Sequence, residues 1–292
     1  MRAFVIGNAA LDETFSVADF PAPGASIFGT MLSQDLGGKG LNQAVTMARA
    51  GLACRFAAAV GHDARGEEIA RRLEAEPLEA HLTALDGVAS DLSMILMTGR
   101  GENAVITTRE AASAVTPAMA QAALEGAAAG DLLVMQGNLG AEATRAALLR
   151  ARERGMKSVV NPSPLQPFFA DLWPLVDIVF VNEGEAAAFG GTDALLEAGP
   201  REVVLTRGAR GAALITRQGR IDVPAEPCAV IDTTGAGDCF MAVTLASAAQ
   251  RGGTLDARAL AHGASAAALT VSRAGTVGAF PDRAEMARIL AT

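Results

Sequence analysis

The chain has 292 residues, of which 50% are hydrophobic and 19% charged, a composition typical of a globular protein and not of a disordered one. Its net charge of −8 argues against a nucleic-acid surface, because that role needs clustered Lys and Arg. No uninterrupted apolar run reaches about 18 residues, and the N-terminus leads into a strand-like segment without a basic leader, so we expect a cytoplasmic protein with no membrane partner. Three cysteines without a CxxC pair and three histidines offer no disulfide framework and no zinc site.

The first third of the chain predicts a strand, two β-rich insertions and two helices. Residues 3–7 form a short apolar run that ends in Gly, as expected for the first central strand of an α/β sheet. Residues 11–36 mix alternating apolar positions with Pro and Gly, which indicates strands around a turn. A second insertion spans 90–108, where residues 92–98 and 103–108 flank Gly99-Arg-Gly101 as in a β-hairpin. Between the insertions we predict a helix at 40–50, a strand at 55–60 and a helix at 67–73.

From about residue 116, strands and helices alternate, which indicates a mostly parallel sheet covered on both faces. The two β-rich insertions, 11–36 and 90–108, predict a small separate sheet, whose natural role is a lid over the crevice where open α/β sheets bind ligands. The predicted helices span 117–128, 141–154, a short segment from 183, 239–251 and 256–272. The predicted strands span 131–135, 157–160, 177–181, 202–206, 212–216 and 220–223.

A glycine-rich turn at 232–240 (DTTGAGDCF) is the strongest chemical signal. Gly235 and Gly237 permit backbone angles closed to other residues, so residues 235–237 can aim their N–H groups at one anion. The apolar run from Cys239 to Ala249 predicts a helix whose positive end strengthens that site. A carboxylate at Asp238 then suits phosphoryl transfer to a hydroxyl, with the carboxylate accepting the proton. An ordinary glycine turn capped by an aspartate explains these nine residues about equally well.

A second glycine-rich turn, residues 37–42 (GGKGLN), also precedes a predicted helix. Lys39 resembles a phosphate-loop lysine, but the GxxxxGK[ST] pattern is not matched, because residue 33 is Ser and residue 40 is Gly. The dinucleotide-binding fingerprint fails too, because the Gly-Ala-Gly of 235–237 is followed by Phe240. Asn42 can hydrogen-bond a hydroxylated ligand as donor and as acceptor. The alternative is a purely structural strand-to-helix turn.

Other polar residues fall near predicted strand ends. Asp12 suits two vicinal hydroxyls, although a solvated loop aspartate is equally plausible from position alone. Asn182 and Glu185 suit phosphate oxygens and a hydrated magnesium ion, and they also match a helix N-cap with first-turn acids. The turn at 206–211 (TRGARG) could clasp a nucleotide phosphate or be a plain hairpin turn. The loop at 273–279 carries no chemistry by itself.

Together these stretches resemble the PfkB/ribokinase family of carbohydrate kinases over nearly the whole chain. Residues 37–45 (GGKGLNQAV) resemble the family's N-terminal signature, and residues 232–238 resemble its C-terminal signature. Supporting matches are Phe20–Gly24, Val60–Asp63 with Gly66, Asn161–Pro164, Asn182 with Glu185, and Thr206–Gly211. The resemblance implies one ribokinase-like α/β domain over 1–292, doubly wound, with a mostly parallel sheet flanked by helices and a β-sheet lid that forms a homodimer contact. It also implies ATP-dependent phosphorylation of a primary hydroxyl of a sugar or sugar-like substrate.

The resemblance implies a role for each matched residue. Asp238 would be the catalytic base, beside an anion hole made by the amides of Gly235, Ala236 and Gly237. The implied sugar-binding residues are Asp12, Gly38, Lys39, Asn42 and Asn138. The implied ATP-binding residues are Asn182, Thr206, Gly208 and Gly211, with Glu185 acting on Mg²⁺ through water. The implied ligands of a monovalent cation, K⁺, mostly through backbone carbonyls, are Asp232, Thr234, Thr270, Arg273, Gly275 and Ala279.

Three departures from ribokinase concern the acceptor. Ala10 stands where ribokinase has Asn, Asn138 corresponds to a sugar-contacting Glu, and residues 110–112 (EAA) replace Gly-Ala-Asn. A missing partner for a substrate hydroxyl costs about 1–3 kcal/mol, roughly 10- to 100-fold in selectivity. The departures therefore weigh against D-ribose as the acceptor.

Two other functions stay open at this point. A nucleoside kinase of the same fold needs a base pocket, and a chain with one Trp and no Tyr supplies base stacking less easily. A non-catalytic sugar- or nucleotide-binding regulatory protein is the alternative from another class. It would not need a base such as Asp238.

Overall fold

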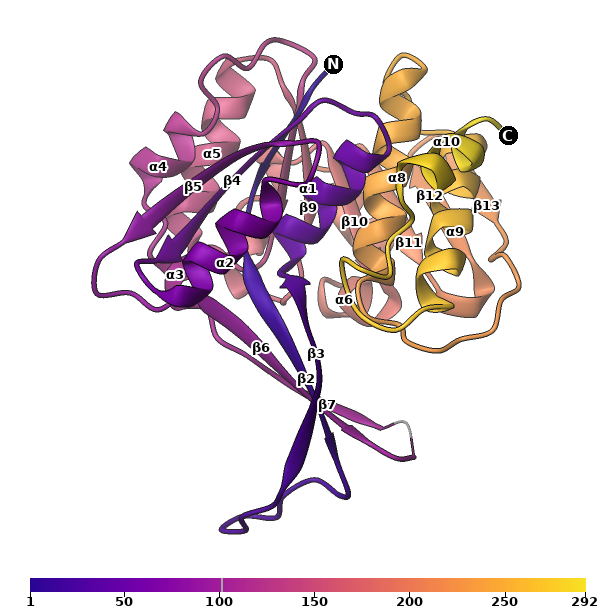
Figure 1. The fold of residues 1–292 in the computed structure, drawn as a ribbon. Coiled ribbons are helices and arrows are strands. Elements are labelled where there is room, and N and C mark those ends of the chain that lie inside the picture. Colours follow the sequence, from indigo (N-terminus) through magenta and orange to yellow (C-terminus); the bar gives the residue numbers. More distant parts are fainter. Residues whose placement is uncertain (101) are drawn as a thin grey trace.

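The computed structural model describes residues 1–100 and 102–292, whose strands form one large and one small sheet (Figure 1). Within these residues the large sheet has nine strands in the order β13-β12-β11-β10-β9-β8-β1-β4-β5. In this sheet the neighbours from β11 through β10, β9, β8, β1 and β4 to β5 pair in parallel, while β11–β12 and β12–β13 are antiparallel. The predicted mostly parallel sheet is therefore confirmed. Its strands are β1 (Ala3–Ile6), β4 (Cys54–Gly61), β5 (Glu79–Leu85), β8 (Leu132–Gln136), β9 (Lys157–Asn161), β10 (Ile178–Asn182), β11 (Glu202–Thr206), β12 (Ala212–Thr216) and β13 (Gly219–Val223).

Helices cover both faces of the large sheet. Ala3 and Val5 of β1 pack into one core with α1, α8 and α9, whereas Phe4 and Ile6 pack into a second core with α4, α5 and α7. Because successive side chains of a strand point to opposite faces, these two cores lie on either side of the sheet. The helices are α1 (Lys39–Arg49), α2 (Ala64–Leu73), α3 (Glu110–Ser113), α4 (Pro117–Ala122), α5 (Ala141–Glu153), α6 (Glu183–Ala188), α7 (Thr192–Ala198), α8 (Ala236–Gln250), α9 (Ala257–Val271) and α10 (Arg283–Leu290), with 3₁₀ turns η1 (Pro167–Asp171), η2 (Trp173–Leu175) and η3 (Gly208–Arg210).

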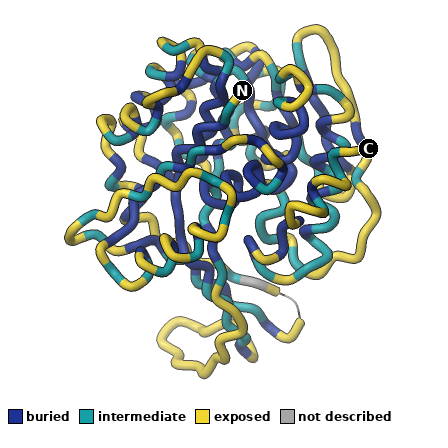
Figure 2. The backbone as a smooth tube through the Cα atoms, turned by 45° about the horizontal axis from the view of Figure 1, so that its top comes forward, coloured by how far each residue is buried: buried dark blue, intermediate teal, exposed yellow. Residues whose placement is uncertain are grey.

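The small sheet projects from this body (Figure 1). It has the order β3-β2-β6-β7 in the described residues, and β2 pairs with β6 in parallel. Its far end is exposed, while the part that joins the body is buried (Figure 2). The strands predicted in the two insertions are confirmed, although Gly101 of the predicted hairpin turn lies outside the described residues. The strands are β2 (Ala10–Val17), β3 (Gly29–Gly37), β6 (Asp91–Thr98) and β7 (Asn103–Thr107).

Helix α8 is the central helix of one layer. Residues 238–248 of it are all buried, because it packs between α1 and α9 as well as on the sheet. A helix that is apolar on all sides is expected in such a position. Its N-terminus meets the carboxyl ends of the central strands, which is where open α/β sheets hold ligands. No helix in the described ranges is long and apolar enough to span a bilayer.

Several predicted boundaries need correction. The helix predicted at 117–128 ends at Ala122, because the chain turns before Gly126, whose φ of +77° does not fit a helix. The helix predicted from 239 begins at Ala236, so the glycine turn forms the first turn of the helix and does not precede it. Four helices and strands were not predicted, namely the largely exposed edge strand β5 and the short helices α3, α7 and α10.

Candidate active site

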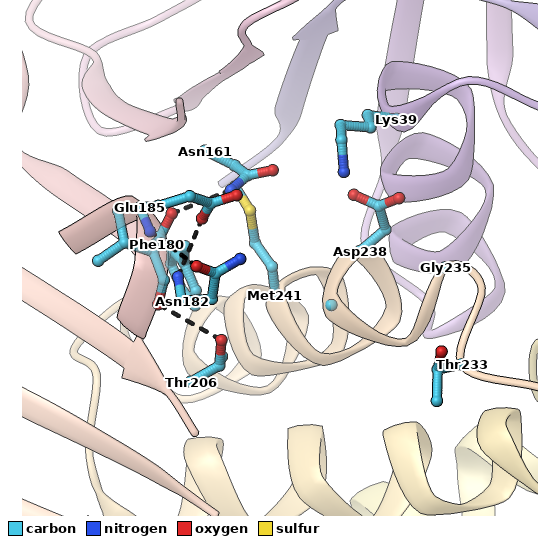
Figure 3. A pocket seen from close by; sticks show the side chains of 12 residues that line it. Lys39, Asn161, Phe180, Asn182, Glu185, Thr206, Thr233, Gly235, Asp238 and Met241 are labelled. Atoms are coloured by element: carbon cyan, nitrogen blue, oxygen red, sulfur yellow. Dashed lines mark hydrogen bonds between the residues drawn. The ribbon is translucent and has the colours of Figure 1, made fainter. Parts of the chain in front are cut away.

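A cavity opens at the carboxyl ends of β9, β10 and β11, beside the N-terminus of α8. In it, the side chains of Lys39 and Asp238 point toward each other, and Asn182, Glu185 and Thr206 lie on the other side (Figure 3). The two glycine-rich turns and the polar strand ends predicted from the sequence therefore converge. The lining residues are Lys39, Asn161, Phe180, Val181, Asn182, Glu185, Thr206, Thr233, Gly235, Gly237, Asp238 and Met241.

The carboxylate of Asp238 is held by side-chain amides on both oxygens. Asn42 donates to Oδ2 over 3.1 Å and Gln43 donates to Oδ1 over 2.8 Å. Behind them, Gln136 donates to Oε1 of Gln43 over 2.7 Å. Asp238 is 5% exposed and the three amide residues are also buried. A buried chain of hydrogen bonds thus fixes the orientation of this carboxylate. The sequence analysis missed Gln43 and Gln136. The available signal was a glutamine within or directly after a largely apolar run of residues.

The N-terminus of α8 has the backbone geometry of an anion site. Gly235 is its N-cap in the left-handed region, with φ +72°. A Cβ there would also lie 2.7 Å from the ring of Phe280, so both conformation and space require glycine. In the described part of the chain the N–H groups of Gly235 and Gly237 have no acceptor, whereas that of Ala236 donates to the carbonyl of Thr233 over 3.3 Å. Two of the three predicted amides can therefore receive an anion without breaking a hydrogen bond.

The turn at 37–42 packs directly against Asp12 and Asn8. A Cβ on Gly37 would lie 2.1 Å from the carboxylate of Asp12, and one on Gly38, whose φ is +93°, would lie 2.9 Å from the carbonyl oxygen of Asn8. The side chain of Asn8 accepts the N–H of Gly40 over 3.3 Å. These glycines let the start of α1 approach Asn8 and Asp12 closely, and Asn42 in its first turn contacts Asp238.

Asp12 lies on β2 of the small sheet and is 6% exposed, so the solvated loop aspartate is the wrong alternative. Burial raises its pKa above the ordinary value, hydrogen bonds from the hydroxyls of Thr276 and Ser93 oppose that shift, and the nearby charges of Asp35 and Asp238 add to it. The Thr276 hydroxyl donates to Oδ2 over 2.8 Å. Asp12 is therefore a buried carboxylate oriented by hydroxyl donors from two other elements.

Three buried amide oxygens near this region accept no hydrogen bond from the described residues. They belong to Asn42, Gln136 and Asn138. Asn138, which follows β8, is buried as well. A buried acceptor without a partner is unfavourable, and its partner is commonly a ligand or water. The acceptors lie beside Asp238 and at the end of β8, where the sequence analysis expected a hydroxylated ligand.

Asn182 and Glu185 form a capping box at the start of α6, which matches the helix N-cap that the sequence analysis gave as the alternative for these residues. The Glu185 N–H donates to Oδ1 of Asn182 over 2.8 Å, and the Asn182 N–H donates to Oε2 of Glu185 over 2.9 Å. Both residues nevertheless line the cavity with Asp238 (Figure 3). The capping bonds fix the direction of the Glu185 carboxylate and use one of its two oxygens.

A second cavity of about 500 Å³ adjoins the first and shares Thr206, Thr233 and Gly237 with it. It contains Gly208 and Gly211 of the β11–β12 connection, which is a hairpin turn as the plain alternative proposed. Small residues of α9 form one wall of this cavity and leave its space open. The sequence analysis missed this wall, although alanines three and four positions apart on a predicted helix were a signal for it. The apolar walls are formed by Ala212, Ala225, Pro227, Val230, Phe240, Ala264, Ala267, Ala268 and Val271.

Asp232 joins the turn before α8 to the loop at 273–279. Its Oδ1 accepts the N–H and hydroxyl of Thr234 over 2.9 and 2.7 Å, and its Oδ2 accepts the N–H of Gly275 over 3.2 Å. The guanidinium of Arg273 pairs with Glu285 instead, so only its backbone is available to this loop. Asp232, Thr234 and Gly275 are thus brought together.

The remaining predicted cation ligands are engaged locally. The buried hydroxyl of Thr270 donates to the carbonyl of Ala266 over 2.9 Å, and the N–H of Ala279 donates to the carbonyl of Thr276 over 3.0 Å. Among the described residues, the carbonyl oxygens of Arg273, Gly275 and Ala279 accept no hydrogen bond. Those oxygens are the groups that the sequence analysis assigned to a cation.

The fold and the site together define a phosphotransferase that acts on an alcohol group. An oriented carboxylate stands beside a helix N-terminus with open amides, at the junction of a polar cavity and a larger apolar one.

The chain belongs to the pfkB family of carbohydrate kinases, whose model matches residues 2–283. It is 28% identical to ribokinase from Haemophilus influenzae over 98% of this chain and 97% of that protein. It is 26% identical to the bifunctional ribokinase/ribose-5-phosphate isomerase A from Fructilactobacillus sanfranciscensis over 99% of this chain, and it spans 56% of that protein's length. The predicted family and reaction class, a sugar kinase, are confirmed.

Solved structures of ribokinases share the fold. Ribokinase from Thermotoga maritima superposes with a TM-score of 0.90 at 24% identity, with all of both chains covered. Ribokinase from Cryptococcus neoformans in complex with ADP has a TM-score of 0.80 at 25% identity and covers 98% of this chain and 99% of that one. The predicted ribokinase-like architecture is therefore confirmed.

Proposed function

We propose that the protein transfers the γ-phosphoryl group of ATP to a primary hydroxyl of an uncharged sugar. One observation carries this proposal: the buried carboxylate of Asp238, held by Asn42 and Gln43, lies in the first turn of α8 beside the open amides of Gly235 and Gly237. A base and an anion site so close together suit attack by a hydroxyl on a phosphoryl group.

Asp238 would accept the proton of the attacking hydroxyl. Its two amide donors keep the carboxylate in one orientation, which reduces the reorganisation needed during the reaction. The amides of Gly235 and Gly237, at the positive end of α8, would stabilise the charge on the migrating phosphoryl group. Lys39, which points toward Asp238 (Figure 3), adds a positive charge on the same side of the cavity.

The adjoining apolar cavity suits the base and ribose of ATP. Its volume of about 500 Å³ is in the range of nucleotide-sized pockets, and Gly208 and Gly211 bring the backbone close to it. Thr206 and Asn182 line the route from there to Asp238, where the phosphates would lie. The complex of the Cryptococcus neoformans ribokinase with ADP supports a nucleotide in this family's fold.

A magnesium ion fits the oxygen-rich side of the first cavity. Asn161, Asn182 and Glu185 present oxygen donors there, and magnesium prefers oxygen ligands while keeping several waters. When bound with ATP, the ion neutralises charge on the phosphates. The capping box would hold Glu185 in place to act through a water molecule.

A potassium ion fits the junction of Asp232 and the loop at 273–279. The carbonyl oxygens of Arg273, Gly275 and Ala279, without partners in the described residues, and the carboxylate of Asp232 are suitable donors. Because Asp232 also binds Thr234 next to Gly235, these residues would hold the anion site in shape. Thr270 would contribute its carbonyl, as the family resemblance implies.

The sugar would bind between Asp12, Gly38, Lys39, Asn42 and Asn138. Carboxylate and amide oxygens predominate there, and such acceptors select a ligand rich in hydroxyl donors. The nearby charges of Asp12, Asp35 and Asp238 disfavour a sugar acid. Ala10 and Asn138 stand where ribokinase has an Asn and a sugar-contacting Glu, so two polar groups expected to face D-ribose are missing. We therefore propose a sugar other than D-ribose as the preferred acceptor.

We further propose that the small sheet acts as a lid and as the contact of a homodimer in the cytoplasm. Its strands and far end expose large apolar side chains, including Phe28, which is 100% exposed. Exposed apolar side chains of this kind favour an interaction surface, and a second copy of the small sheet has the matching character. They belong to Ile27, Phe28, Met31, Leu32, Val105 and Ile106.

A coupled assay of ADP release tests the proposal over D-ribose, 2-deoxy-D-ribose, D-fructose, D-xylose, gluconate, ribitol and adenosine. We expect a neutral sugar to stimulate ADP release above the rate with ATP alone, and gluconate to have no effect. Preferential stimulation by adenosine would favour a nucleoside kinase. No stimulation by any acceptor would favour a non-catalytic binding protein.

A further inference from the structure

The loop at 273–279 contacts aspartates from three distant segments. The Thr276 hydroxyl donates to Asp12 over 2.8 Å, the N–H groups of Thr276 and Gly278 donate to Asp35 over 3.2 and 2.8 Å, and the N–H of Gly275 donates to Asp232 over 3.2 Å. The loop therefore links strands β2 and β3 of the small sheet to the turn that begins α8.

Thr276 supplies the one polar side chain of this loop between Ala274 and Phe280. It is 2% exposed, and its hydroxyl reaches a carboxylate that is itself buried. Asp12 and Asp35 are directly paired across β2 and β3, so two like charges stand side by side. The loop offsets their repulsion with three donors, of which the Thr276 hydroxyl is the one that contacts Asp12.

The loop is also fixed from its other side, which gives the hydroxyl a defined position. The guanidinium of Arg49 donates to the carbonyls of Val277 and Phe280 over 3.0 and 3.4 Å, and it forms an ion pair with Glu76. A hydroxyl on a loop held at both ends can determine the direction of the carboxylate that it contacts.

Building on the proposed function, we propose that Thr276 is a positioning residue for the sugar, because its hydroxyl fixes the orientation in which Asp12 receives the acceptor. Thr276 does not line the proposed ATP cavity. Its methyl group faces Gly235, whereas its hydroxyl is bonded to Asp12, so we assign the hydroxyl to the acceptor. Loss of the hydroxyl leaves the loop anchored by Arg49 and Asp35. The Asp12 carboxylate would keep the Ser93 hydroxyl as a donor but would be oriented less strictly.

Steady-state kinetics of Thr276→Val and Thr276→Ser test this role with D-ribose, 2-deoxy-D-ribose and the fastest acceptor of the ADP-release panel as probes. Valine keeps the shape of threonine without the hydroxyl, and we expect it to raise the KM for the acceptor about tenfold. The KM for ATP and kcat should stay within about twofold of the wild type, and serine should restore the acceptor KM. Thr144→Val, which removes another buried hydroxyl bonded within α5, is the matched control and should leave both KM values unchanged.

Calorimetric binding of the same acceptor to Asp238→Asn proteins with Thr or Val at 276 separates binding from turnover, and the Val protein should bind about tenfold more weakly. An unchanged acceptor KM in an active Thr276→Val enzyme, an equal rise in the ATP KM, or no restoration by serine would overturn the role of Thr276. Absence of acceptor-dependent ADP release from the wild type would count against the proposed function instead. Should the valine protein fail to fold, Thr276→Cys, with a weaker donor, should give an intermediate KM.

Discussion

Gln43 donates a 2.8 Å hydrogen bond to the carboxylate of Asp238, although 195 residues separate them in the chain. Gln43 in turn accepts a hydrogen bond from Gln136, so the proposed base is connected to β8 through a buried amide. Gln43 is held by bonds on both its amide N–H and its amide oxygen, which favours a single orientation of the Asp238 carboxylate. The proposed base is therefore positioned by the fold itself.

Gln43→Leu should reduce kcat about 10- to 100-fold, because a hydrogen bond to a charged group contributes about 1.5–3 kcal/mol. The KM for ATP should not change, since Gln43 is remote from the second cavity. Gln136→Leu removes the next link but leaves the bond to Asp238, so its loss should be smaller. Steady-state rates of both variants provide the comparison, and equal kcat in Gln43→Leu and wild type would contradict a positioning role.

Asp91 should make the stability of the protein depend on pH. Its buried carboxylate accepts the N–H groups of Ala111 and Ala112 over 3.0 and 3.1 Å, and burial raises its pKa to about 6. Because the folded state holds the proton more tightly, this stabilising contribution is complete below the ordinary value of 3.8 and is lost as the pH rises through about 6.

Thermal unfolding of the wild type and Asp91→Asn between pH 4.5 and 7.5 (roughly the window set by that shift) measures the effect. The free energy of unfolding of the wild type should fall by about 2 kcal/mol relative to the variant over this pH range. Parallel curves for the two proteins would show that Asp91 does not titrate in this range.

Phe28→Asp should convert a dimer into a monomer. Burial of this fully exposed ring in a partner would contribute about 1.5–3 kcal/mol, and a charge there would be left without a partner. Light scattering after size exclusion should then give one chain of 29.7 kDa in place of two. Leu149→Asp, on the exposed side of α5, is the control and should leave the mass unchanged. A wild type that is already monomeric would refute the proposed contact.

Potassium should raise kcat/KM about 5-fold or more above sodium at equal ionic strength. The reason is the shared position of Asp232, which contacts Thr234 beside the anion site and Gly275 in the carbonyl-rich loop. Asp232→Asn should abolish the difference between the two salts. Identical rates of the wild type in both would remove the cation from the proposed mechanism.

Local sequence patterns predicted much of this site but could not predict its long-range partners. The glycine turns at 37–42 and 235–237 were identifiable because Gly37, Gly38 and Gly235 are required by a positive φ or a close approach. Gly237, by contrast, is helical with open space around it, so the special backbone angles expected there are not found. The contact between Thr276 and Asp12 spans 264 residues, and nothing near either residue signals it. Periodicity also could not show that the anion turn is the first turn of α8, since two of its residues are glycines.

Asp238→Asn tests the central claim most directly. The amide is nearly isosteric with the carboxylate, and the unpartnered Oδ1 of Asn42 can turn to accept its N–H, so the variant should fold and bind ATP. Acceptor-dependent ADP release should fall about 10²- to 10⁴-fold, because the base that accepts the hydroxyl proton is gone. Turnover close to that of the wild type in a folded, ATP-binding Asp238→Asn protein would contradict the mechanism.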